Sequence, residues 1–144
     1  MHFYITLTTK CNLECRYCYG KLCNDFGTNF EKFTVDYDLP ADIQYSLSTL
    51  QRFLEHDPNP TLIFYGGEPL LQIDVIKELM DTTTARYMIQ TNGLLLDQIE
   101  PEYLNRFHTV LVSIDGDEKL TDYYRGKGVY RKIMQNIQQV YSRG

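Results

Sequence analysis

Four strand-length apolar runs, separated by helix-like segments, constrain the fold of this sequence most strongly. Runs that lack polar alternation are typical of strands buried on both faces, as in parallel sheets. Strands that alternate with helices predict a parallel α/β arrangement with right-handed crossovers. In such folds the chemistry lies at the carboxyl ends of the strands. The predicted strands are residues 3–7, 61–65, 87–90 and 109–114.

Helical periodicity occupies the segments between these runs. Pro40 suits a helix start, and Ile43, Leu47, Leu50 and Leu54 follow at spacings of four, three and four, so an amphipathic helix is predicted over residues 40–54. Further helices are predicted at residues 73–81, directly after Pro101, and from about Tyr130. A chain of 144 residues has room for one ordinary domain, so residues 1–144 are predicted to form a single domain.

Charge and hydropathy exclude several classes of partner. The formal net charge is −5 and there is no basic block, so neither nucleic acid nor an anionic membrane surface is expected to be the main partner. The most apolar stretches are far shorter than the roughly 20 residues that span a bilayer. The N-terminus lacks the pattern of a signal peptide. We therefore expect a cytoplasmic protein.

Cys11, Cys15 and Cys18 form the motif C-x3-C-x2-C directly after the first predicted strand. In a reducing compartment such clustering favours metal binding over disulfides. Ligands from one loop can wrap an iron–sulfur cubane and leave one iron open for a reactant. A zinc site completed by Cys23 or His2, an electron-carrier ferredoxin, and plain structural cysteines are the alternatives. If the cluster is present, Cys23 is expected to be a spare or packing cysteine, because a fourth ligand would block the open iron.

Polar segments follow the other strands as well. Gly66 and Gly67 allow a close backbone approach, and Glu68 with strand-end carbonyls would suit an ammonium group, although the segment could also be a plain tight turn. Thr91 and Asn92 carry groups that can bond ribose or carboxylate oxygens, in a sequence that is also a common turn signal. Ser113, Asp115 and Arg125 are further polar side chains at or beyond the end of the fourth predicted strand. Asp115 could instead cap a turn, and Arg125 could be a solvated surface side chain.

Taken together, these motifs resemble the radical S-adenosylmethionine superfamily. The resemblance rests on Cys11, Cys15 and Cys18, with Tyr17 as the aromatic residue before the last cysteine, followed in order by the glycine–glutamate, Thr-Asn-Gly and Ser-Ile-Asp-Gly segments. It implies that the three cysteines bind a 4Fe–4S cluster. It also implies that S-adenosylmethionine is bound by Tyr17, Gly66, Gly67, Glu68, Thr91, Asn92, Ser113, Asp115 and Arg125.

The resemblance carries further expectations about fold and activity. It implies a partial (β/α) barrel with about four of the usual six βα units, so the core domain is expected to be incomplete at its C-terminus. Reductive cleavage of S-adenosylmethionine would give a 5′-deoxyadenosyl radical. The motifs are most similar to peptide- and protein-modifying members, including anaerobic sulfatase-maturing enzymes. A peptide or protein substrate and an electron donor such as flavodoxin or ferredoxin are the implied partners. A cluster- and cofactor-binding fragment without turnover, or a glycyl-radical activase, are the alternatives.

Overall fold

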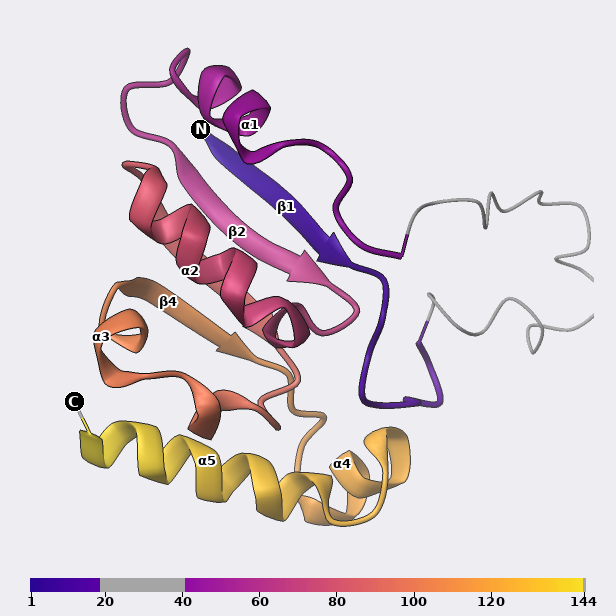
Figure 1. The fold of residues 1–144 in the computed structure, drawn as a ribbon. Coiled ribbons are helices and arrows are strands. Elements are labelled where there is room, and N and C mark those ends of the chain that lie inside the picture. Colours follow the sequence, from indigo (N-terminus) through magenta and orange to yellow (C-terminus); the bar gives the residue numbers. More distant parts are fainter. Residues whose placement is uncertain (19–40, 144) are drawn as a thin grey trace, which may run out of the picture.

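The computed structural model describes residues 1–18 and 41–143, and within these ranges the chain forms a four-stranded parallel sheet. The strands lie side by side in the order in which they occur along the chain, β1 to β4. Figure 1 labels β1, β2 and β4 of this sheet. This arrangement confirms the predicted parallel α/β class. The strands are β1 (His2–Thr8), β2 (Thr61–Gly66), β3 (Arg86–Thr91) and β4 (Phe107–Val112).

Helices connect successive strands and follow the last one. The helices are α1 (Leu47–Leu54), α2 (Ile73–Thr82), α3 (Pro101–Leu104), α4 (Glu118–Arg125) and α5 (Val129–Arg143), with 3-10 turns η2 (Pro69–Gln72) and η3 (Leu96–Gln98). When each parallel strand is added beside its predecessor with the same crossover hand, the connecting helices gather on one face of the sheet. None of the helices in the described part of the chain has both the length and the apolar character that crossing a membrane requires.

The core lies between that face and its helices. Alternate strand residues are buried there against α1, α2 and α3, and Ile137 and Val140 of α5 pack against the same cluster. On the other face, Tyr4 of β1 is 65% exposed and Leu111 of β4 is 45% exposed. The sheet therefore has one covered and one open face. The buried core side chains include Ile5, Leu7, Leu50, Leu54, Leu62, Phe64, Ile76, Leu79, Met80, Ile89 and Leu104.

The first helix is shorter than predicted. It begins at Leu47, because the Ser46 side chain caps it by accepting a hydrogen bond from the Thr49 N–H at 3.2 Å. Residues 41–43 instead run along the end of β1, where the Ile43 N–H donates to the Leu7 carbonyl at 3.0 Å. The apolar spacing at Ile43 thus reflects packing beside a strand. Pro40, the predicted helix start, lies outside the described residues.

The end of the chain holds a second difference. The fourth strand was predicted at residues 109–114 but occupies Phe107–Val112, which leaves Ser113 and Ile114 beyond it. Helix α4 was not predicted at all. Asp117 caps this helix by accepting from the Leu120 N–H at 2.9 Å, and Thr121 is its buried residue. A helix of eight residues is shorter than the stretch over which an apolar period identifies a helix in a sequence.

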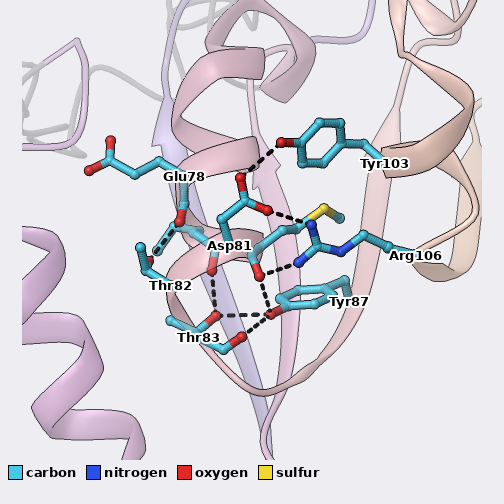
Figure 2. Close-up of polar contacts among 9 residues, drawn as sticks. Glu78, Asp81, Thr82, Thr83, Tyr87, Tyr103 and Arg106 are labelled. Atoms are coloured by element: carbon cyan, nitrogen blue, oxygen red, sulfur yellow. Dashed lines mark hydrogen bonds and ion pairs between the residues drawn. The ribbon is translucent and has the colours of Figure 1, made fainter.

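A polar network holds the opposite, amino-terminal edge of the sheet together (Figure 2). Asp81 at the end of α2 accepts from Arg106 Nη1 at 2.5 Å and from the Tyr103 hydroxyl at 2.8 Å. The Tyr87 hydroxyl donates to the Thr83 carbonyl at 2.6 Å. These bonds join the end of α2 to the segments that enter β3 and β4. They lie away from the carboxyl ends of the strands.

Candidate functional site

The segments that follow the strands meet at one edge of the sheet, as predicted. In Figure 1 the strand arrows point toward the side that carries the loop after β1 and helix α4. The Glu68 N–H after β2 donates to the Lys10 carbonyl after β1 at 2.8 Å. After β4, the Ser113 N–H donates to the Thr91 carbonyl at 3.0 Å. Backbone hydrogen bonds therefore link neighbouring loops at this edge.

Gly66 and Gly67 allow β2 to approach the stretch that leads into the cysteine loop. A Cβ on Gly66 would lie 2.2 Å from the Thr8 carbonyl oxygen, and one on Gly67 would lie 2.2 Å from that of Lys10. Real Cβ atoms do not come this close, so both positions require glycine. The Gly67 N–H also donates to the Thr8 carbonyl at 2.8 Å. The turn after β2 thus sets where the chain enters Cys11.

Glu68 is a fully buried carboxylate with 0% exposure. Its Oε1 accepts from the Thr91 hydroxyl at 2.7 Å and from the Leu70 N–H at 3.0 Å, and its Oε2 accepts from the Asn92 N–H at 2.8 Å. Burial raises the pKa of this carboxyl, while the hydrogen bonds it accepts act in the opposite direction. Within residues 1–18 and 41–143, no ion pair involves Glu68. A buried carboxylate without a cation fits a ligand ammonium group.

The three predicted ligand cysteines, Cys11, Cys15 and Cys18, are half-buried and have free thiols. The Cys18 N–H donates to the Cys15 carbonyl at 3.0 Å, which bends the loop back on itself. Cys11 Sγ accepts from the Leu13 N–H at 3.4 Å. Burial raises the pKa of the Cys15 thiol, Arg125 opposes this rise, and the other two thiols add to it. Cys11 and Cys18 are therefore close enough to Cys15 to influence the pKa of its thiol.

These donors fit an iron–sulfur cluster. Within the described ranges, no three Cys, His, Asp or Glu side chains lie close enough to hold one metal ion. In a 4Fe–4S cluster each thiolate binds a different iron, so its ligands are spread over a larger body. Soft thiolates with N–H donors to sulfur are the surroundings that such clusters use. Cys23, the proposed spare cysteine, lies outside the described residues.

Tyr17, Asp115 and Arg125 form a clamp between the cysteine loop and α4. The Tyr17 hydroxyl donates to Asp115 Oδ1 at 2.8 Å and accepts from Arg125 Nη2, while Arg125 Nε donates to Asp115 Oδ2. Burial, followed by the hydrogen bond to Asp115, raises the pKa of Tyr17 to about 12. The Arg125 side chain is 10% exposed, so it is not a solvated surface arginine. The sequence singled out these residues but did not reveal that they contact one another.

The other predicted residues differ in how they are engaged. Thr91 and Asn92 are buried, and both bond to Glu68. Ser113 is half-buried, and none of the hydrogen bonds among the described residues involves its hydroxyl. Two residues of this edge were not predicted. Asn12 accepts from Asn92 Nδ2 at 2.7 Å, and the buried Thr121 hydroxyl accepts from the Asp115 N–H at 3.2 Å.

A family model described as a 4Fe-4S single cluster domain matches residues 3–137. The chain belongs to this family of cluster-binding domains, within the radical S-adenosylmethionine superfamily to which its anaerobic sulfatase-maturating relatives belong. The family named from the sequence motifs is thereby confirmed.

Curated relatives are similar over almost all of this chain. An uncharacterized protein of Archaeoglobus fulgidus is 33% identical over 137 residues, which are 93% of this chain and 30% of that protein. A cysteine-type anaerobic sulfatase-maturating enzyme of Clostridium novyi is 29% identical over 90% of this chain and 37% of that enzyme. A probable GTP 3′,8-cyclase of Methanocella arvoryzae is 29% identical over 97% of this chain and 43% of that protein. The chain spans less than half the length of these relatives.

Solved structures share the fold. The structure of native anSMEcpe with bound AdoMet and Cp18Cys peptide matches with a TM-score of 0.71 at 21% identity, over 99% of this chain and 40% of that chain. A histidine-tagged form of the same protein with bound AdoMet matches with a TM-score of 0.73 at 20% identity. This likeness, together with the parallel sheet, confirms the predicted partial α/β barrel.

Proposed function

We propose that residues 1–144 are the part of a radical S-adenosylmethionine enzyme that binds the 4Fe–4S cluster and the cofactor. Cys11, Cys15 and Cys18 are the proposed cluster ligands. The observation that carries the proposal is the contact between the loop holding these cysteines and the glycine turn that ends in Glu68. The carboxylate of Glu68 is buried and has no cation among the described residues. A loop of three cysteines beside a buried carboxylate that lacks a cation suits a cluster and an amino-acid cofactor bound next to each other.

Each neighbouring segment has a proposed role toward S-adenosylmethionine. Glu68 and the strand-end carbonyls near Gly66 and Gly67 would receive the ammonium group. The Ser113 hydroxyl, free of hydrogen bonds among the described residues, is available for a ribose or carboxylate oxygen. Arg125 would attract the cofactor carboxylate while Asp115 and Tyr17 hold its guanidinium in place. Thr91 and Asn92 act by fixing Glu68 rather than by direct contact.

When bound, the reduced cluster and S-adenosylmethionine would supply the chemistry, which is one-electron reductive cleavage of the cofactor into methionine and a 5′-deoxyadenosyl radical. The proposed role of this chain is to orient the bound groups and to shield them from water. The buried side chains of Thr91, Asn92 and Glu68 exclude water from the floor of the site. The clamp of Tyr17, Asp115 and Arg125 holds the cysteine loop over that floor.

A peptide or protein is the proposed substrate, and a small redox protein such as flavodoxin or ferredoxin is the proposed electron donor. Similarity to a sulfatase-maturating enzyme and to a structure with a bound peptide supports the substrate class. Similarity to a GTP 3′,8-cyclase favours a nucleotide as the second candidate substrate.

Electron paramagnetic resonance on the anaerobically reconstituted and dithionite-reduced chain tests the proposal. We expect a 4Fe–4S signal that changes when S-adenosylmethionine is added and is lost in Cys15→Ala. Tight zinc binding without a reconstitutable cluster would overturn the proposal. Formation of methionine and 5′-deoxyadenosine would distinguish a catalytic unit from one that binds both groups without turnover.

A further inference from the structure

The side chain of Asn92 lies between β3 and the cysteine loop with its amide orientation fixed. Asn92 is 7% exposed, and its Oδ1 accepts from the Leu94 N–H at 3.0 Å. Its NH₂ group must therefore face the other way. There Nδ2 lies 2.7 Å from Asn12 Oδ1 and 3.8 Å from Cys11 Sγ. The amide thus presents its donors to the first cysteine of the motif.

The backbone that carries this donor is held from several sides. The Asn92 N–H donates to Glu68 Oε2 at 2.8 Å, and the Gly93 N–H donates to the Thr91 hydroxyl at 3.0 Å. Fully buried Asn136 of α5 donates to the carbonyls of Gly93 and Leu94, each at 2.9 Å. The donor is therefore in place before any cluster binds, and little reorganisation is needed when it acts.

We propose that Asn92 is a positioning residue for Cys11 that raises the reduction potential of the cluster, an inference that rests on the proposed cluster site. A reduced 4Fe–4S cluster carries one more negative charge than the oxidised form. A hydrogen bond to a ligand sulfur therefore stabilises the reduced form more, and such bonds are among the determinants of cluster potential. Together with the Leu13 N–H, Asn92 makes Cys11 a ligand that accepts two donors.

Asn12 modulates this effect because its Oδ1 accepts from the same NH₂ group and so influences where that group points. At 2.7 Å it is the closer acceptor in the cluster-free chain. When Cys11 is a thiolate bound to iron, its negative charge makes it the stronger acceptor, so the donor is expected to shift toward sulfur. The role differs from the cofactor contact first expected of Asn92, because the side chain faces a cluster ligand.

The test is a redox titration of the reconstituted chain, in which electron paramagnetic resonance reports the fraction of reduced cluster. We expect Asn92→Ala to disfavour reduction about tenfold, which for a one-electron couple is a downward shift of about 59 mV. Asn92→Asp keeps the acceptor for the Leu94 N–H but replaces the donor with a negative charge, so its potential should fall further. Asn105→Asp, just before β4 at the opposite edge, is the matched charge control and should leave the potential unchanged.

Several outcomes would overturn the inference. The inference is overturned if the cluster in Asn92→Ala has the same reduction potential as in the unmodified chain. Any fall in the potential of Asn92→Asp would then come from its negative charge alone. If Asn92→Ala does not fold, Asn12→Ala gives an independent reading, because removal of this second acceptor should keep or raise the potential. A fall in Asn12→Ala would contradict the inference. Absence of any cluster in the unmodified chain would instead refute the proposed function.

Discussion

Arg125 and Asp115 form an ion pair whose side chains are 10% and 20% exposed, and the Tyr17 hydroxyl bonds to both. Through this contact the cysteine loop near the N-terminus rests on a helix more than a hundred residues later. The pair therefore does more than neutralise charge. It links the cysteine loop on one side of the candidate site to α4 on the other side.

Removal of Asp115 should destabilise the chain more than removal of Glu118, an exposed ion-pair partner on α4. Asp115→Ala leaves a nearly buried guanidinium without its carboxylate, and we expect a loss of about 2–3 kcal/mol in the free energy of unfolding. Glu118→Ala breaks the exposed pair with Arg131 and should change it by less than about 0.5 kcal/mol. Urea unfolding of the cluster-free variants measures both. Equal losses in the free energy of unfolding would mean that the clamp stabilises the chain no more than an exposed ion pair does.

Gly67→Ala should disrupt the cysteine loop by steric contact. The added Cβ would lie 2.2 Å from the Lys10 carbonyl oxygen, so β1 and β2 would have to separate near Cys11. Gly128→Ala is the matched control, because Gly128 has a φ of +82° but no atom within 4 Å of the added Cβ. We expect the control to cost about 1–2 kcal/mol and to keep its iron. Gly67→Ala should lose both stability and iron in reconstitution. Normal iron content in Gly67→Ala would contradict this.

Glu68 should make the cluster-free chain less stable as pH rises. Burial raises the folded-state pKa of this carboxyl, so its contribution is fully present below the unfolded pKa of about 4.3 and is lost as pH rises through the folded value. The stability advantage of the unmodified chain over Glu68→Gln should therefore shrink across that window. The loss of a hydrogen bond in the variant adds an offset that does not depend on pH.

Glu100 provides a control of opposite sign. The hydrogen bond from Lys77 lowers the pKa of Glu100, so its contribution is present above the unfolded pKa and is lost as pH falls through the folded value. The difference between the unmodified chain and Glu100→Gln should therefore grow with pH. Denaturant titrations at several pH values measure both differences. Parallel pH trends in the two comparisons would refute the assignment for Glu68.

Arg106→Met should separate stability from cluster binding. Arg106 bonds to Asp81 and to the Met80 carbonyl at the edge of the sheet opposite the cysteines (Figure 2). Because both partners are partly exposed, we expect a modest fall in melting temperature, smaller than that of Asp115→Ala. Iron content after reconstitution should be unchanged. A loss of iron would show that the two edges of the sheet are coupled.

The sequence predicted the sheet well because each strand is an apolar run that ends in a polar turn. The position of the site followed from the same pattern, since parallel strands bring their carboxyl ends together. Helix α4 could not be predicted, because it has only eight residues, its buried residue is Thr121, and its apolar side chains Leu120, Tyr123 and Tyr124 are exposed. The contact of Arg125 with Tyr17 joins residues far apart in the sequence. No local signal indicates such a pair, and none indicates that Asn92 faces Cys11.

The pairing order of the strands has a consequence for how the site comes into being. Phe64 pairs with Ile89, and Ile89 with Val110, so β2, β3 and β4 are joined by helix-containing crossovers that are shorter than the connection between β1 and β2. Ile5 pairs with Phe64 across a much longer stretch of chain, which makes closure of this loop the entropically costly step. We therefore expect β1 to dock after the other strands have assembled. Since β1 delivers the cysteines, capture of iron would report that folding is complete.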